Sequence, residues 1–533
     1  MSDGNKHHGE SAIDEILSVP IPSDWLRTTI AQIGAVRLGR QRSPKNRSAN
    51  HPTKYLRAAN LTWTGLDLSD LLDMEFRPDE LTTYRLHPGD VLLSEASGSP
   101  TEVGKPAIWN GEIEDCCFQN TVIRFRSKSV EPKFALIAFQ HFARNNVFSR
   151  VSRGVGIHHL NADRFASMPF LLPPQNEQRR IVEKIEELFS DLEAGAAALT
   201  RARANLKRYR ASVLKAAVEG SLTAEWRACQ AHSPRGGQGL GEGFEPASQL
   251  RDRILTERRR QWEADQLTKF TAAGKQPPQN WQAKYVEPAP PDTSKLRALP
   301  DGWGWGSVEQ LSTKVVDGVH KKPEYVSEGV PFITVRNLTA GPGISFERTQ
   351  FVTEQDHTEF IKRANPQRGD ILISKDGTLG VTRAVRTDRE FSIFVSVALV
   401  KPVERTTSDF LEIAFTSPTV QRQMVGKGSG LQHIHLEDLR QDCIPLPSLA
   451  EQKEIVTEVA EKLSQIEAAE VAIDHSLRRA ARLRQSILKQ AFEGKLVPQH
   501  PTDEPASALL ERIRREYNDR EQTTAPTKRR GKA

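Results

Sequence analysis

The stretch NEQRRIVEKIEEL at residues 176–188 decides the fold, because it returns near the end of the chain as AEQKEIVTEVAEKL at residues 450–463. A second pair of strings, SVLKAAVEGSL from residue 212 and SILKQAFEGKL from residue 486, has the same separation of 274 residues (451 − 177 and 486 − 212). A repeat of this length far exceeds a solenoid unit of roughly 20–50 residues. The chain is therefore a duplicated half-protein, with two related halves in one polypeptide.

Each repeat predicts a long helix. In the first helix, apolar or small side chains recur in unbroken steps of three and four, which is the heptad seam of a coiled coil. These positions are Ile185, Leu188, Leu192, Gly195, Leu199, Ala202, Leu206, Tyr209, Val213 and Ala216. The seam of the second helix is interrupted at Glu470 and Arg484. Each helix ends at a glycine, Gly220 or Gly494, which is a common C-terminal stop, and about 40 helical residues span about 60 Å.

A globular block precedes each helix. The blocks open with the matching strings IPSDW at residues 21–25 and LPDGW at residues 299–303. Both contain a Gly-Asp turn that leads into an apolar run, PGDVLLS at 88–94 and RGDILIS at 368–374, which predicts a turn entering a buried strand. Proline-rich strings close the blocks and precede the helix starts.

The expected fold class is α+β. It consists of two α/β domains, separated by two long helices that form an antiparallel coiled coil, with an internal pseudo-twofold duplication. The expected segments are a disordered lead-in at 1–20, a first domain at 21–173, a long helix at 174–223, a helix and linker at 224–298, a second domain at 299–447, a second long helix at 448–496, and a short helix with a basic disordered tail at 497–533.

A smaller repeat supports the duplication. PASQLRDRIL from residue 246 matches PASALLERIR from residue 505, a separation of 259 residues in place of 274. The difference of 15 residues falls in the Gly-rich stretch at 233–243, whose composition is that of a flexible loop.

The amino-acid composition indicates the cellular location of the protein and the charge of its partner. The 533 residues carry a net charge of +6, which favours an anionic partner. The four cysteines form no C-x-x-C pair, so neither a disulfide framework nor a metal site is expected, and a reduced cytoplasmic location is the default. A membrane-spanning helix needs about 18 consecutive apolar residues, and no apolar run in the sequence approaches that length. The first ten residues lack the apolar core of a secretory signal.

Catalytic motifs are missing from the sequence. The nearest approach to a phosphate-binding loop, from Gly98 to Gly104 and Lys105, has one residue too many and Pro106 where a hydroxyl belongs. Neither a G-x-S-x-G nucleophile elbow nor an H-E-x-x-H zinc helix occurs. The sequence therefore favours a non-catalytic recognition protein. Two alternatives stay open: an enzyme with a hidden active site, and a coiled-coil scaffold whose globular blocks bind protein.

Candidate contact residues lie in Gly-rich and basic loops. Glycines let a backbone approach a partner closely, and Gln or His can hydrogen-bond to base edges or phosphates, while basic turns can contact phosphates. The alternatives are a turn whose His caps the following helix and a merely solvated charged surface. The candidate DNA-binding residues are Arg40, Arg42, Lys45, Arg47, Arg153, His158, His159, His320, Lys321, Lys322, Lys375, Lys427, Gln432 and His433.

The whole pattern resembles the specificity subunit of a type I restriction-modification system. The resemblance spans roughly residues 21–520 and is carried by LPPQNEQRRIV at 172–182, LPSLAEQKEIV at 446–456, and the S-[VI]-L-K-x-A-x-E-G-x-L helix ends. The first copy departs slightly, with Leu-Leu-Pro-Pro before the Glu-Gln pair and Val218 in place of Phe492.

The resemblance implies a function. Each globular block would be a target recognition domain that reads one half of a split site in double-stranded DNA, and the helices would set the spacer. Methyltransferase subunits and translocase-nuclease subunits would be the protein partners. S-adenosylmethionine, ATP and Mg would then belong to those partners, with no cofactor in this chain. A twofold-related pair of domains also suits a pseudo-symmetric target such as duplex DNA.

Overall fold

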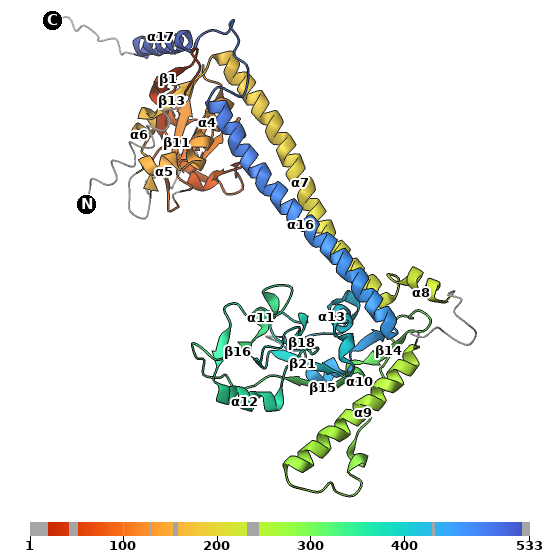
Figure 1. The fold of residues 1–533 in the computed structure, drawn as a ribbon. Coiled ribbons are helices and arrows are strands. Elements are labelled where there is room, and N and C mark those ends of the chain that lie inside the picture. Colours follow the sequence, from red (N-terminus) through yellow and green to blue (C-terminus); the bar gives the residue numbers. More distant parts are fainter. Residues whose placement is uncertain are drawn as a thin grey trace, which may run out of the picture. The chain divides into compact units, whose positions relative to one another are not determined.

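The computed structural model describes residues 20–41, 52–99, 101–127, 129–152, 158–231, 245–428 and 432–524. These residues fold into two compact units. The first unit contains the described residues up to Leu199 together with those from His475 onward, and the second unit contains Thr200–Asp474. The long helices α7 (Gln175–Glu219) and α16 (Leu449–Phe492) therefore each contribute one part to each unit (Figure 1).

The first unit holds five small sheets and several helices, and two of the sheets are the strand pairs β4 (Leu61–Thr62) with β5 (Gly65–Leu66) and β8 (Ala96–Ser97) with β12 (His158–His159). A four-stranded antiparallel sheet has the order β2 (Ala35–Leu38), β11 (Val122–Arg126), β7 (Val91–Ser94), β9 (Pro106–Ile108). A three-stranded sheet has the order β10 (Cys117–Phe118), β3 (Pro52–Leu56), β6 (Leu72–Glu75), and β1 (Leu26–Thr29) pairs with β13 (Pro169–Leu172). The helices are α2 (Ile30–Ile33), η2 (Ala58–Asn60), α3 (Pro78–Tyr84), α4 (Pro132–Arg144), α5 (Val147–Val151), α6 (Ala162–Ser167) and α17 (Ala506–Thr524).

The second unit repeats the other three sheets of the first. Its four-stranded antiparallel sheet has the order β15 (Ser312–Asp317), β21 (Val397–Pro402), β18 (Ile371–Ser374), β19 (Thr382–Ala384). The smaller sheets are β17 (Gln350–Val352), β16 (Val330–Ile333), β20 (Ser392–Ile393), and the pair β14 (Gly304–Ser307) with β22 (Cys443–Leu446). The helices are α8 (Ala224–Ala231), α9 (Ala247–Ala272), η3 (Trp281–Lys284), α10 (Val308–Leu311), α11 (Val335–Thr339), α12 (Glu354–Arg363), η4 (Arg405–Thr407), α13 (Ser408–Thr416), α14 (Pro418–Gln421) and α15 (Leu436–Gln441).

In the three sheets that the units share, the strand orders and directions agree, including the parallel pairs β10–β3 and β16–β20. This agreement confirms the duplication and the mixed helix and strand content expected from the sequence. The structural agreement also covers parts of the domains in which the two halves share few residues, such as the loops between the strands. The central strands β7 and β18 are buried along their whole length. They follow turns in which Gly89 and Gly369 adopt left-handed backbone angles (φ 91° and 88°).

The repeated strings fasten each domain to the long helices. In the first unit the indole nitrogen of Trp25 donates to Glu177 at the start of α7, at 3.0 Å. A Cβ on Gly494, just beyond the end of α16, would lie 2.3 Å from the Pro22 ring. Each globular block therefore rests on the start of one long helix and the end of the other.

The second unit has the same fastening. Trp303 donates to Glu451 at 2.8 Å, and a Cβ on Gly220 would lie 2.4 Å from Pro300. Glu451 also accepts a hydrogen bond from Thr223 at 2.7 Å and an ion pair from Arg227 at 2.8 Å. In each unit the Pro-x-x-Trp string that opens the globular block therefore contacts the Glu-Gln pair at the start of one long helix and the Glu-Gly pair at the end of the other.

The long helices run antiparallel within each unit. In the second unit Arg203 lies 3.2 Å from Asp474 and Arg210 lies 3.5 Å from Glu470. The residue numbers rise along α7 while those of their partners fall along α16, which shows that the helices run in opposite directions. In the first unit Arg484 pairs with Glu193 at 3.0 Å and its guanidinium lies over the Phe189 ring. The two apparent interruptions of the second seam are therefore occupied by ion pairs between the helices.

Two seam positions expected on α7 are wrong. Gly195 is exposed with open space around it, and the Tyr209 side chain is also exposed. Ala196 and Arg210 are the partly buried residues at these levels. A straight α-helix has 3.6 residues per turn and drifts against a strict heptad spacing, so the contact line moves by one residue.

The expected lead-in at residues 1–20 and the Gly-rich loop lie almost wholly outside the described residues, as does the end of the tail. Within the described part of the chain, no helix is both long enough and apolar enough to cross a membrane.

Candidate nucleic-acid interface

Three parts of the chain meet beyond the ends of β15 and β18 in the second unit: the turn at 318–322, residues 375–377, and residues 427–428 with 432–434. The amide of Ile434 donates to the Lys375 carbonyl at 2.9 Å, and the backbone amide of Lys375 donates to the Ser396 carbonyl at 2.9 Å. Lys427 and His433 exchange two backbone hydrogen bonds of 2.9 Å. Residues distant in the sequence are thereby held side by side.

The first unit holds the equivalent segments in the same way. The amide of Leu160 donates to the Glu95 carbonyl at 2.7 Å, and the backbone amide of Glu95 donates to the Thr121 carbonyl at 2.8 Å. The short strand β12 (His158–His159) pairs with β8 (Ala96–Ser97). We call this meeting of three segments the junction of each unit. The junctions share a backbone pattern although their side chains differ.

A glycine fixes where each turn crosses its neighbour. A Cβ on Gly39 would lie 2.2 Å from the Gln119 carbonyl oxygen, and one on Gly318 would lie 2.0 Å from that of Ile393. The chain can pass this point only with hydrogen in place of a side chain. Gly39 and Gly318 are therefore equivalent, and the residues just before them, Leu38 and Asp317, occupy the same place in the two domains.

A buried carboxylate gathers positive charge at the second junction. Asp317 accepts an ion pair from Lys375 at 3.1 Å, another from Arg363, and a contact from His320 at 3.2 Å. Burial alone raises the pKa of Asp317, but hydrogen bonds from Arg363, His320 and Lys375 outweigh it and hold the pKa below its ordinary value.

Immediately around Asp317 the charge remains positive. One carboxylate neutralises only one of the two permanent cations that surround it. The side chains of Arg363 and His320 remain 49% and 63% exposed, so the surplus charge faces solvent. An exposed positive surplus of this kind is suited to phosphate oxygens.

Each junction also presents a histidine held by a carboxylate. Nδ1 of His433 lies 2.5 Å from Asp376, and Nδ1 of His159 lies 3.1 Å from Glu95. The carboxylate orients each ring, because a proton on Nδ1 can be donated to it. These imidazoles are 44% and 53% exposed. Neither caps the following helix: Asn161 caps α6, and His435 precedes α15.

The other candidate residues have different surroundings. Arg40 is largely enclosed, pairs with Glu80 at 2.9 Å and lies over the Phe76 ring, so its guanidinium is used inside the first domain. His158 is half-buried and lies 3.4 Å from the Ser152 hydroxyl. Lys427 pairs with Asp438 at 2.8 Å yet stays exposed. Exposed positions are also occupied by Lys321, Lys322 and Gln432. Arg42, Lys45, Arg47 and Arg153 lie outside the described residues.

Sequence reasoning missed Asp317 and Arg363. Arg363 ends α12, and 46 residues separate it from the carboxylate it binds. No local spacing joins them. The only available signal was the pair of glycines, Gly39 and Gly318, whose equivalence would have placed Asp317 at the crossing. In the part of the chain that the structure describes, no group of three or more His, Cys, Asp or Glu side chains could hold a metal ion.

Comparison with known proteins agrees with this geometry. The family model of the type I restriction modification DNA specificity domain matches residues 22–199 and 318–477. The EcoKI specificity subunit of Escherichia coli K12 is 25% identical over 487 residues, which cover 86% of this chain and 88% of that protein. The EcoBI specificity subunit of Escherichia coli is 26% identical over 376 residues, covering 68% and 67%.

Solved structures support the fold. A chain from a structure described as showing complex assembly and conformational transition of the type I R-M system aligns with a TM-score of 0.60 at 17% identity, covering 89% of this chain and 99% of that one. The HsdS subunit of Thermoanaerobacter tengcongensis aligns with a TM-score of 0.51 at 18% identity, covering 89% and 98%. Since the family match covers more than half of the residues, the chain belongs to the type I restriction-modification DNA specificity family.

Proposed function

We propose that this member of the specificity family is the DNA-recognition subunit of a type I restriction-modification complex. The domain at 21–173 would read one half of a split site and the domain at 299–447 the other. One observation carries the proposal: the two junctions share a backbone but differ in charge at equivalent points. Leu38 stands where the second domain has Asp317, and Glu95 stands where it has Lys375.

This combination is what two readers of different sequences need. A shared frame presents loops to a duplex in the same way, while unlike side chains select unlike base edges. At the second junction the cations around Asp317 would contact phosphates. His159, His433 and Gln432 would lie within reach of base edges or phosphates.

The long helices would set the unread spacer between the half-sites. The 45 residues of α7 correspond to about 68 Å of helix, whereas duplex DNA rises about 3.4 Å per base pair. The helices thus offer enough length for one or two turns of DNA between the readers.

The chemistry would come from partner subunits. We infer that this chain is non-catalytic, and that methyltransferase subunits and translocase-nuclease subunits supply S-adenosylmethionine, ATP and Mg. The proposal is supported by the names of the relatives, which are specificity subunits of type I restriction enzymes.

The test is a domain exchange. Residues 21–173 are replaced by the corresponding domain of a relative, and modified adenines are mapped in cells that carry the partner subunits. We expect one half of the methylated motif to change and the other half and the spacer to stay. A change in both halves would refute the division of labour. Methylation or cleavage by the purified chain alone would favour the hidden enzyme, and the lack of any sequence-specific footprint with the partners would favour a protein-binding scaffold.

A further inference from the structure

A groove lies beside the end of α16 in the first unit. It encloses about 890 Å³, a size typical of sites that hold a ligand, which measure about 300–1,000 Å³. Its walls are α4, the start of α5, β13 and the last turns of α16. The floor is apolar and consists of Phe142, Phe170, Leu171, Leu488 and Phe492. The groove therefore suits an occupant that can bury apolar side chains.

The rim of the groove is rich in positive charge. The cations that line it are Arg144, Arg150, Arg482, Arg484 and Lys489, and Glu493 is the carboxylate among the lining residues. Two of these cations are already paired: Arg484 lies 3.0 Å from Glu193, and Lys489 lies 3.8 Å from Glu493.

Two rim cations remain without a carboxylate. Arg482 is exposed, and Arg144 is exposed with its guanidinium over the Trp63 ring. Neither forms an ion pair with any residue that the structure describes. Burial lowers the pKa of His141, which also lines the groove, to about 4, so its ring adds no charge near pH 7. The rim therefore favours an acidic occupant.

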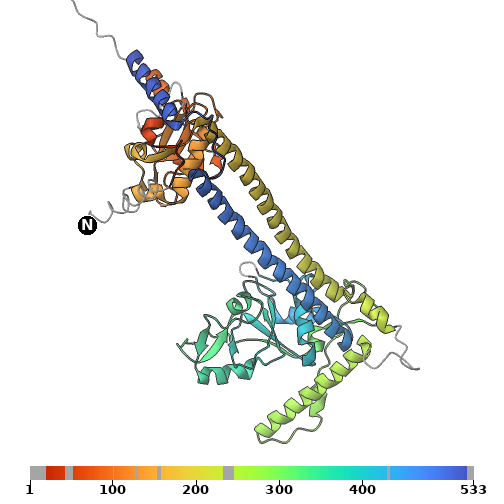
Figure 2. The ribbon, with the colours of Figure 1, turned by 45° about the horizontal axis from the view of Figure 1, so that its top comes forward.

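In the second unit, the chain before the Pro-x-x-Trp string lies against its own domain. The two ribbon views show α9 extending away from the sheets and the following residues returning alongside it (Figures 1 and 2). We call α9 and the returning residues 273–291 the arm. The rings of Trp262 and Trp281 stack with centroids 5.8 Å apart, and Tyr285 lies 5.3 Å from Trp262. The stretch expected as a linker therefore packs back on a helix.

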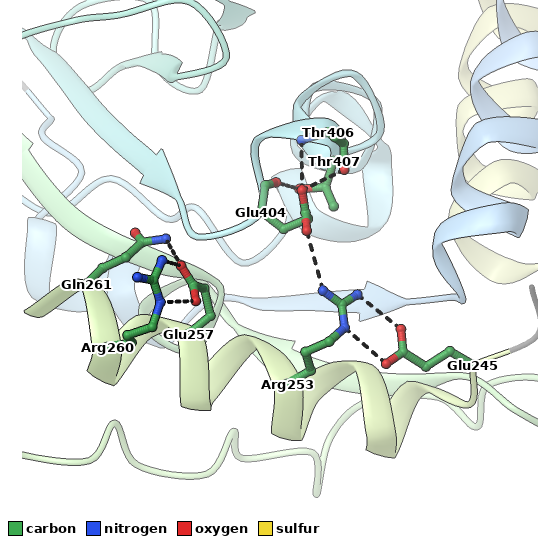
Figure 3. Close-up of polar contacts among 8 residues, drawn as sticks. All are labelled: Glu245, Arg253, Glu257, Arg260, Gln261, Glu404, Thr406 and Thr407. Atoms are coloured by element: carbon green, nitrogen blue, oxygen red, sulfur yellow. Dashed lines mark hydrogen bonds and ion pairs between the residues drawn. The ribbon is translucent and has the colours of Figure 1, made fainter.

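The root of the arm is fixed to the domain. Ile254 is buried in the core of the second unit. Figure 3 shows Arg253 between two carboxylates: it donates to Glu245 at 3.1 Å and reaches Glu404 at 3.5 Å. The arm thus delivers its returning end to a defined place on the domain.

That returning end, residues 292–297, touches two elements. The Cys443 thiol at the start of β22 donates to the Asp292 carbonyl at 3.8 Å, and Arg297 pairs with Glu219 at the end of α7. The equivalent elements of the first unit are β13 and the end of α16, and both border the groove. The segment before the Pro-x-x-Trp string therefore has, in the second unit, contacts with the counterparts of two groove walls.

The first unit has its own segment before the string: residues 10–19, with the sequence ESAIDEILSV. This segment carries three acidic and five apolar side chains and contains neither Lys nor Arg. Its charge is thus opposite to that of the rim, and its apolar residues match the floor.

The segment joins the described chain at the border of the groove. Ile21 packs against the core cluster that contains Leu488 and Phe492. Pro22 faces the end of α16, because a Cβ on Gly494 would lie 2.3 Å from its ring. Ten residues can extend over about 33 Å, so residues 10–19 have ample length to follow the groove.

We infer that residues 10–19 of this chain occupy the groove, with their apolar side chains on its floor and their carboxylates at its rim. A short tether gives such a segment an effective concentration near 1 mM, so an affinity of only about 0.1 mM would keep it bound about ten times as often as free. A segment of another chain would have to compete with that concentration. The contact would fasten the first domain to the end of α16 and goes beyond the recognition of DNA.

The experiment uses the purified full-length chain. A photoreactive benzoylphenylalanine replaces Leu17, and mass spectrometry identifies the cross-linked peptides. We expect cross-links within one chain to residues 138–150 or 481–493. Hydrogen exchange of the amides of residues 10–19 should be about tenfold slower than in a synthetic peptide of the same sequence.

Charge reversal tests the rim. The double variant Arg144→Glu/Arg482→Glu should lose most of the protection of residues 10–19, and adding Asp14→Lys/Glu15→Lys to it should restore that protection. Arg514→Glu makes the same charge change on α17, outside the groove, and should leave the protection at the wild-type level. The cross-links and exchange rates of the chain without rim variants decide the inference even where a rim variant fails to fold.

The remaining outcomes overturn the inference. Exchange of residues 10–19 at the rate of the free peptide would show that the segment is unbound. Cross-links that join two chains would make the groove an interface between copies. Cross-links that form only with methyltransferase subunits in the assembled complex would make the segment a docking element for that partner. Protection that survives the rim reversal, with cross-links outside the groove, would place the segment elsewhere on the domain.

Discussion

Replacing Gly220 by alanine tests the joint between the second domain and the end of α7. Gly220 has a left-handed backbone (φ 76°), and an added Cβ would lie 2.4 Å from the Pro300 ring. The left-handed conformation costs an alanine roughly 1–2 kcal/mol. Forcing the methyl group against the proline adds about 1–3 kcal/mol, the usual range for overpacking. We therefore expect Gly220→Ala to lower the free energy of unfolding of the second unit by about 2–5 kcal/mol.

Two other glycines separate these contributions. Gly274 also has a left-handed backbone (φ 63°) but no atom within 4 Å of an added Cβ, so Gly274→Ala should cost only the backbone part, about 1–2 kcal/mol. Gly195 lies inside α7 with open space around it, and Gly195→Ala should stabilise the helix by about 0.5–1 kcal/mol. Urea unfolding followed by tryptophan fluorescence measures all three. Equal losses for Gly220→Ala and Gly274→Ala would show that the contact with Pro300 contributes nothing.

Three further predictions concern charge. Glu451→Gln should destabilise its unit by about 1.5–3 kcal/mol in urea unfolding, because the buried carboxylate binds a guanidinium. The equivalent change Glu177→Gln should cost less free energy of unfolding, since the partners of Glu177, Trp25 and Gln499, are neutral. A larger loss of stability at Glu177 than at Glu451 would contradict this ranking. Burial and the nearby Asp438 raise the pKa of Asp442 to about 7, so the folded protein favours the neutral carboxyl. Stability should therefore fall as pH rises from about 4 towards 7 and stay low above pH 7. Asp442→Asn should flatten that part of the plot of melting temperature against pH, and an unchanged slope would count against this role of Asp442. Lys375→Gln should weaken or alter methylation at the half-site of the second domain alone, as read by adenine mapping, and an effect at the first half-site would remove Lys375 from the interface.

Periodic and repeated features of this protein could be predicted from sequence. The 274-residue separation placed both long helices and both domains, and the alternation of three and four placed most of the seam. Helical periodicity is a local property of neighbouring residues, which is why it survives without knowledge of the rest of the chain. The exceptions at Gly195 and Tyr209 arise where the packing of the partner helix decides which of two adjacent residues faces it.

The candidate site was predictable only in part. The loops that carry His159, His433 and Lys375 were identified because they are rich in glycine and charge. Arg40 belongs to the same kind of loop, yet its guanidinium is enclosed by Glu80 and Phe76. Composition cannot distinguish these cases, since it does not say which neighbours a long side chain will meet.

The sequence by itself determined that this protein is two related halves, each a mixed helix and strand domain joined to a long helix. Only the tertiary structure decided how those parts combine: that each domain rests on the end of the other half's helix, that Arg363 crosses 46 residues to reach Asp317, and that the residues after α9 fold back as an arm. The physical reason is the distance along the chain over which each kind of interaction acts. Helix and turn preferences act between residues a few positions apart, whereas the charge presented at each junction depends on where a strand crosses a glycine and which distant side chain arrives there.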